Sequence, residues 1–264
     1  MVGRCLILLL ISYESIAQTY LGPRFQAMGN TGAALQGIYS LAVNPAGLSA
    51  LERPTVSLDY QHHFFATDIT TQSAMLGVPT RLGTFGLAVR QYGLKGAFDD
   101  IKAGFSFAKQ LAPYFILGMS ASFHQLYVPN YLSTSALSVD VGMQYLFGEG
   151  AIVGLQYANV GKADYGSDAY GTIPAYLRIG VSYPLVAVLV SADVVYRAVG
   201  SLGGHLGIEY RLGEVLHLRG GLSVNPMERH AGFGFHWQRL TFNTAASFHS
   251  RLGTSPQIGL CYAF

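Results

Sequence analysis

The sequence predicts an all-β protein, a transmembrane antiparallel β-barrel of about fourteen strands with a short N-terminal hatch or plug segment. Three observations lead to this prediction. The chain begins with a candidate export signal. It is rich in hydrophobic residues but has no run long enough for a membrane helix. Large apolar residues alternate with small or polar ones over most of its 264 residues.

The start of the chain has the features of a secretory signal peptide. Arg4 precedes the apolar run Leu6–Ile11, and Ser15 and Ala17 supply the small residues of a cleavage site. The run is much shorter than the roughly 20 residues of a membrane helix. We therefore expect residues 1–17 to be removed on export.

Composition favours a barrel over a soluble β-protein. Hydrophobic residues make up 50% of the chain and charged residues 11%, against about 25% charged residues in soluble domains. The 17 tyrosines and 15 phenylalanines can form interfacial girdles, and the 32 glycines leave room in a narrow lumen. The formal charge of +2 is too small to indicate a nucleic-acid partner. Outer-membrane lipid is the expected surrounding.

Residues 18–54 do not alternate and are expected to form the hatch segment. Asn44-Pro45 is a turn signal, and Gly29 and Gly32 weaken the helical turns before it. The segment is either a periplasmic linker below the barrel or a hatch inside the lumen. Inside the lumen, Arg24 would need a carboxylate partner. The candidates for this partner are Asp59, Asp140 and Glu209.

Residues 55–264 are expected to form the barrel, from about fourteen segments of ~10 residues each. The pattern is clearest where Leu137 and Val139 point to one face and Ser138 and Asp140 to the other. The second face is mostly Gly, Ser and Ala. A soluble sandwich would carry Lys, Glu and Asp there, so this pattern favours a lumen.

The connections between strands alternate in length. Residues 148–150 and 212–214 are short connections, whereas 94–100, 128–133 and 161–173 are longer and more polar. Short periplasmic turns and longer external loops are the rule in outer-membrane barrels. We therefore expect a protein of the outer membrane of a Gram-negative bacterium, with both termini in the periplasm.

Charges inside the strands are expected to face the lumen, because a charge on the lipid face costs about 2–4 kcal/mol at the bilayer midplane. Mixed signs in a narrow lumen either form ion pairs or line a polar conduction path, and both alternatives stay open. The charges that strand parity assigns to the lumen are Asp59, Arg90, Lys102, Asp140, Arg178, Arg197, Glu209, Arg211 and Arg219.

The chain ends on an aromatic residue, as outer-membrane barrels usually do. Its last nine residues put large apolar side chains on one face and Gln, Gly, Cys and Ala on the other. Such a strand resembles the signal that the barrel-assembly machinery reads, which makes that machinery an expected partner. The residues of this candidate assembly signal are Ile258, Leu260, Tyr262 and Phe264.

The sequence contains no catalytic or metal-binding motif. It has no Gly-x-Ser-x-Gly elbow, Walker loop or His-Glu-x-x-His, and the adjacent His62 and His63 point to opposite faces of one strand. Only Cys261 follows the candidate signal peptide, so no disulfide is expected. We expect a protein that is not an enzyme and that binds no cofactor or metal.

Two stretches before the barrel resemble a known family. Residues 24–34, Arg-Phe-Gln-Ala-Met-Gly-Asn-Thr-Gly-Ala-Ala, and residues 41–48, Leu-Ala-Val-Asn-Pro-Ala-Gly-Leu, resemble the N-terminal signature of the FadL superfamily. The likeness is greatest to its PorV/PorQ branch in Bacteroidetes-type bacteria. The chain is short for this superfamily, which implies a reduced hatch and loops. The matching positions are Arg24, Met28, Gly29, Gly32, Asn44, Pro45, Ala46 and Leu48.

This resemblance implies two alternative functions. The PorV/PorQ-like signature implies an accessory subunit of a larger outer-membrane protein complex for secretion or assembly, such as type IX secretion. The wider superfamily implies a passive transporter that admits a hydrophobic or amphipathic small solute through a hatch-gated lumen. The accessory subunit is the main prediction, and the transporter is the alternative.

Overall fold

The computed structural model describes residues 20–65, 68–166, 172–198 and 200–264. The candidate signal peptide lies outside the described residues, so its cleavage stays a prediction. In the described part of the chain, no helix is long and apolar enough to cross a membrane.

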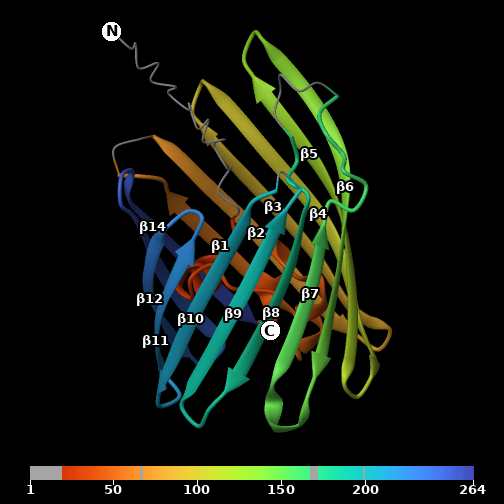
Figure 1. Ribbon diagram of the computed structural model, residues 1–264, viewed down its shortest axis with the longest axis vertical. Coiled ribbons are helices and arrows are strands. Elements are labelled where there is room, and N and C mark those ends of the chain that lie inside the picture. Colours follow the sequence, from red (N-terminus) through yellow and green to blue (C-terminus); the bar gives the residue numbers. More distant parts are fainter. Residues whose placement is uncertain (1–19, 66–67, 167–171, 199) are drawn as a thin grey trace, which may run out of the picture.

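In this part of the chain, fourteen strands form one closed antiparallel barrel, in which each strand pairs with its neighbours in sequence (Figure 1). The first strand closes the barrel against the last, with Thr55 opposite Ala263 and Gln61 opposite Gln257. The predicted fold class is confirmed. The strands are β1 Thr55–His62, β2 Ile69–Thr80, β3 Gly83–Leu94, β4 Phe98–Ala112, β5 Phe115–Val128, β6 Leu132–Leu146, β7 Ile152–Ala158, β8 Tyr176–Pro184, β9 Val188–Arg197, β10 Leu202–Leu212, β11 Leu216–Val224, β12 Glu228–Trp237, β13 Leu240–His249 and β14 Gly253–Ala263.

The two faces of the wall differ as strand alternation predicts. On β6, Leu137 is 71% exposed on the outer face, whereas Ser138 and Asp140 are buried on the lumen face. The same arrangement, with apolar side chains outside and polar side chains inside, recurs around the barrel, where most of the exposed large side chains are apolar. An apolar outer face suits hydrocarbon rather than water.

Exposed aromatic side chains gather near both ends of the strands. Tyr183, Tyr210 and Trp237 lie beside the short turns, and Tyr127 and Tyr196 lie toward the opposite end. Aromatic rings prefer the two membrane–water interfaces, so these residues form the girdles of a membrane barrel. The apolar band lies between them.

Two connections that were expected to be long external loops are turns of three residues each, 95–97 and 129–131. β3 ends at Leu94 and β4 begins at Phe98, while β5 ends at Val128 and β6 begins at Leu132. β4, β5 and β6 have 15, 14 and 15 residues, and one side of the barrel is therefore taller than the other (Figure 1). The expected connections at 94–100 and 128–133 are present, but their expected length was wrong.

Cross-strand pairing of polar side chains explains the longer strands. Asp100 accepts a 2.8 Å hydrogen bond from Arg90 on the lumen face, and Asp99 accepts one of 2.8 Å from Gln91 on the outer face. Because each aspartate has a partner on the neighbouring strand, the polar residues continue the ladder instead of ending it.

The segment before the barrel, residues 20–54, lies inside it (Figure 1). This N-terminal segment contains helix α1 (Pro23–Ala27) and two short 3₁₀ helices, η1 (Ile38–Ala42) and η2 (Pro45–Ala50). A further 3₁₀ turn, η3 (Gly148–Gly150), joins β6 to β7. Helix α1 contacts β11 to β14, and η2 contacts β3 to β6, so the segment reaches opposite sides of the wall.

The apolar core lies between the N-terminal segment and the wall. Phe25, Met28 and Leu48 have no exposed surface, and Met75 and Cys261 extend the core from the wall. Burying a side chain of this size contributes roughly 1.5–3 kcal/mol. Apolar burial therefore favours the lumen as the position of the N-terminal segment.

Candidate functional site

Asn44 ties the N-terminal segment to the wall. Its side chain is fully buried, and its amide nitrogen lies 2.7 Å from the Ala33 carbonyl oxygen and 3.1 Å from that of Met143 on β6. Its oxygen accepts a 3.1 Å bond from the backbone N–H of Ala46 and so caps η2. Pro45 fits the first turn of η2, because this position needs no backbone donor.

A buried ion pair holds the turn that precedes Ala34. The Asp193 carboxylate on β9 accepts hydrogen bonds of 2.8 and 3.0 Å from the backbone N–H groups of Gly32 and Ala33. Arg178 donates to the same carboxylate at 3.1 Å and to the Asn30 carbonyl at 2.8 Å. Asp193 was not among the predicted site residues. Strand parity could have found it, because it shares a face with Arg197.

Uncharged lumen residues bind the N-terminal segment at further points, and these residues were not among the predicted site residues. Their hydrogen-bonding side chains lie on different strands and meet backbone or side-chain groups of the segment. The contacts are Gln144 to the carbonyls of Ala33 and Leu35, Ser182 to the carbonyl of Ala34, His205 to the carbonyl of Gly29, and Ser247 to the side chain of Gln26. Such polar residues fit many positions of a lumen, so alternation alone does not select them.

Arg24 binds Glu209, one of its three candidate partners. Two guanidinium nitrogens of Arg24 lie 3.0 and 3.1 Å from the two carboxylate oxygens of Glu209. Arg219 on β11 donates to the same carboxylate at 2.7 Å and to the Asn243 side-chain oxygen at 2.7 Å. One carboxylate is thus shared between the N-terminal segment and the wall.

Most of the other charges assigned to the lumen also have partners of opposite charge. Arg90 pairs with Asp100 at 2.8 Å, and Lys102 lies 3.7 Å from Asp140. The described residues that differ are Asp59, which is buried and has no basic partner, Arg197, which is partly buried, and Arg211, which is exposed at the end of β10. Of the two alternatives for the lumen charges, the described residues therefore show ion pairing.

The closest approach between the N-terminal segment and the wall occurs at glycines. A side chain at Gly154 would overlap the Ala33 carbonyl, and one at Gly221 would overlap the backbone of Gly29. Ten of the fourteen strands contribute one such glycine on the lumen face, and we call this set the glycine belt. Its members are Gly77, Gly86, Gly118, Gly142, Gly154, Gly180, Gly207, Gly221, Gly232 and Gly259.

Gly221→Leu is expected to displace the N-terminal segment while the barrel still forms. The new side chain would overlap the backbone of Gly29, whereas the interstrand hydrogen bonds of β11 are unchanged. Trypsin should then cut at Arg24, which limited proteolysis of the purified protein would detect. Gly220→Leu on the outer face of the same strand is the matched control. Equal protection of Arg24 in both variants would argue against close packing at the glycine belt.

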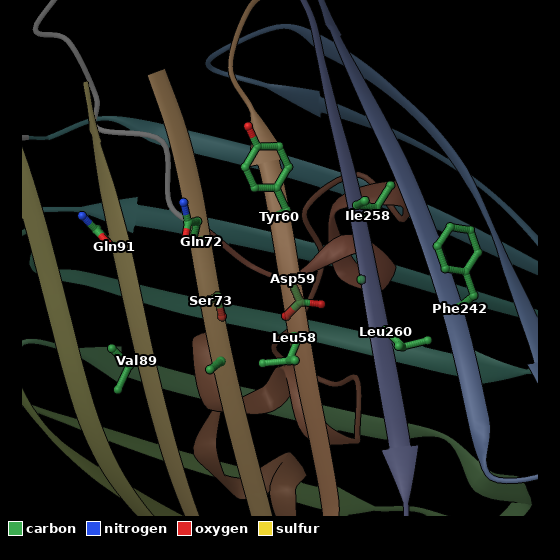
Figure 2. Close-up of a pocket in the computed structure, with 12 residues that line it drawn as sticks. Leu58, Asp59, Tyr60, Gln72, Ser73, Val89, Gln91, Phe242, Ile258 and Leu260 are labelled. Carbon is green, nitrogen blue, oxygen red and sulfur yellow. The ribbon is translucent and has the colours of Figure 1, made fainter. Parts of the chain in front are cut away.

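A groove runs along the outer face of the wall where β14, β1 and β2 meet (Figure 2). Its polar end carries Gln72 and Gln91, which lie opposite each other in register. Mostly apolar side chains of the outer face line the rest, with Leu58 and Val89 below the two glutamines in the view of Figure 2. A groove with an apolar length and an amide end suits an amphipathic molecule. The other outer-face residues that line it are Tyr60, Ala74, Phe242, Ile258 and Leu260, and the lumen-facing residues Asp59, Ser73 and Gly259 lie between them along the strands.

Solved structures share this architecture, although no protein-family model and no curated protein matches the chain. The Pseudomonas putida toluene transporter TodX aligns with a TM-score of 0.69 and 16% identity, over 93% of this chain and 97% of that chain. A Pseudomonas aeruginosa FadL homologue aligns with a TM-score of 0.66 and 11% identity, over 92% of this chain and 98% of that chain.

A TodX deltaS2S3 mutant, described as a monoaromatic hydrocarbon channel, aligns with a TM-score of 0.67 and 15% identity. The alignment covers 92% of this chain and 99% of the mutant's chain. Identities this low establish the fold alone. The chain has the fold of TodX and of the FadL homologue.

Proposed function

We propose that the protein is a passive outer-membrane transporter for a small hydrophobic or amphipathic solute, and that the N-terminal segment closes its lumen. One observation carries the proposal: the segment reaches opposite sides of the wall and is attached by separate hydrogen bonds and ion pairs. A hydrogen bond between uncharged groups contributes about 0.5–1.5 kcal/mol net, and one to a charged group contributes about 1.5–3 kcal/mol. Contacts of this size can be exchanged one after another, so the segment can rearrange without opening the barrel.

Two further observations support the class of solute. TodX is described as a toluene transporter and its mutant as a monoaromatic hydrocarbon channel, and both have this fold. The groove beside β1 offers an apolar surface with an amide end to a molecule in the bilayer. The same proposal includes a position in the outer membrane of a Gram-negative bacterium, with the short turns and the C-terminus in the periplasm.

The comparisons support this alternative better than the accessory-subunit role that was the main prediction. TodX is described as a transporter and its mutant as a channel, and none of the structures named above is described as a subunit of a secretion machine. The PorV/PorQ branch and an association with type IX secretion have no further support. A protein partner therefore forms no part of the proposed function.

Uptake by whole cells tests the proposal. Expression in a Gram-negative host that lacks its own hydrophobic channel should raise the uptake of labelled toluene and of a medium-chain fatty acid. Uptake of a small sugar should not change, because the closed lumen offers no open aqueous path. A rise for all three solutes would indicate an open pore, and no rise for any of them would contradict transport.

A further inference from the structure

Asp59 differs from the lumen carboxylates that pair with a basic side chain. The buried Asp140, Asp193 and Glu209 and the half-buried Asp100 each pair with an arginine or a lysine, and the buried Glu228 lies 3.7 Å from His230. Among the described residues, no ion pair joins Asp59 to a basic side chain, although Asp59 is only 6% exposed. A buried carboxylate without a counter-charge is costly.

Five buried polar atoms around Asp59 have no hydrogen-bond partner within the described chain. They are Oδ2 of Asp59, the hydroxyls of Tyr20 and Ser73, and both amide atoms of Gln257. Each of these side chains is more than nine-tenths buried. The Tyr20 hydroxyl faces Asp59, Ser73 and Gln257, but no hydrogen bond of ordinary geometry joins it to them. An unsatisfied buried polar group costs about 1–3 kcal/mol, so a cluster of five unpaired polar atoms needs an explanation.

The strand register brings these groups together. Ser73 on β2 and Gly259 on β14 lie directly opposite Asp59, and Gln257 is on the same lumen face two residues from Gly259. Figure 2 shows Asp59 and Ser73 on adjacent strands, with the N-terminal segment behind them. Oδ1 of Asp59 is already occupied, because it accepts hydrogen bonds of 2.9 Å from Ser57 and 3.0 Å from Tyr39. Oδ2 is the free carboxylate oxygen.

We propose that this cluster binds one small monovalent cation, with Na⁺ as the fitting ion. Hard cations take oxygen ligands from carboxylates, amides and hydroxyls, and four side chains here supply an oxygen each. One carboxylate balances a single positive charge, whereas a divalent ion would leave an uncompensated charge in a buried site. The ion would join three strands of the wall to Tyr20, and so hold the N-terminal segment where it enters the lumen.

Thermal unfolding of the full chain in mild detergent tests the site. The wild-type protein is measured in increasing NaCl, with N-methyl-D-glucamine chloride keeping the ionic strength constant. A cation that binds the folded state raises Tm in a saturable way. We expect a rise of several degrees for the wild type and no rise for Asp59→Asn. The broadening of the ²³Na NMR signal by the wild-type protein should likewise disappear in Asp59→Asn.

Two further variants keep the test decisive if Asp59→Asn fails to fold. Ser73→Ala retains the carboxylate and removes one oxygen. The Na⁺ midpoint, which is the NaCl concentration that gives half of the full rise in Tm, should therefore become several-fold higher. Asp100→Asn removes a carboxylate that pairs with Arg90, so it should retain the wild-type Na⁺ midpoint. A wild-type Tm that is the same in both salts would overturn the proposal and assign water or a protonated Asp59 to the cluster. An unchanged Na⁺ midpoint in Ser73→Ala would overturn it as well.

Discussion

Removal of residues 18–54 is expected to turn a silent barrel into a conducting pore. The barrel strands begin at Thr55, so the truncation leaves every interstrand hydrogen bond in place. It removes the segment that contacts opposite sides of the wall and exposes the glycine belt, which has no side chains to refill the space. Planar bilayer recordings should show discrete conductance steps for the truncated protein and none for the full chain.

The recording needs a control for assembly. The truncated barrel should show the shifted mobility of an unboiled barrel in gel electrophoresis, since closed barrels resist detergent. If the truncated and full proteins are both assembled and both silent, the barrel side chains alone fill the lumen. The N-terminal segment would then be a docking element, and the accessory-subunit role would gain over the transporter.

Glu209→Ala is expected to loosen the N-terminal segment far more than Arg24→Ala. Without Glu209, the guanidinium groups of Arg24 and Arg219 face each other with no carboxylate between them. Breaking a buried ion pair in this way costs about 3–5 kcal/mol. Without Arg24, Glu209 keeps its 2.7 Å bond to Arg219, so the loss is smaller.

The rate of proteolysis within the N-terminal segment, measured in increasing urea, compares these two variants. A protease that does not require arginine is needed, because Arg24 is itself a trypsin site. Arg211→Ala at the exposed end of β10 is the control and should behave like the wild type. The contrary result is release of the segment at the same urea concentration in Glu209→Ala and Arg24→Ala. The loss of the Arg219 ion pair would then add nothing, and the shared carboxylate would not be the contact that holds the segment.

The sequence predicts the barrel well because alternation depends only on neighbouring residues. Leu137 and Ser138 must point to opposite faces in any strand, so their exposure follows directly from their order. The strand ends are less predictable. Asp99 and Asp100 continue β4 only because Gln91 and Arg90 lie beside them on β3, and a single sequence does not show this pairing.

The contacts of the N-terminal segment are harder to predict than the strands. Arg24 had three candidate carboxylates, and the choice of Glu209, 185 residues away, depends on how the segment is rotated inside the lumen. Asp193 and Gln144 face the lumen by parity, but only the turn at Ala33 selects them from other lumen residues. Packing, not local pattern, decides these contacts.

The motif that gave the family resemblance has a structural role here. Asn44 caps η2 and binds the wall, and Gly29 and Gly47 occur where a side chain would overlap neighbouring atoms. These residues fix the N-terminal segment inside a barrel, whatever the barrel transports. The motif therefore indicates the fold and does not by itself distinguish a transporter from an accessory subunit.

Transport by the proposed mechanism requires the N-terminal segment to move, and a reversible lock tests this movement most directly. A Cβ atom on Gly232 would lie 2.8 Å from the Cβ atom of Ala27 and would also overlap the backbone carbonyl of Thr244 on β13. A disulfide between these positions therefore requires a local shift of β12, and the single Gly232→Cys variant must first show wild-type uptake. The pair Ala27→Cys and Gly232→Cys is made with Cys261→Ser, and each single cysteine serves as a control. Uptake of labelled toluene should stop when the pair is oxidised and return when it is reduced. Equal uptake by the oxidised and reduced pair would show that the solute passes without displacing the segment, and would contradict the account.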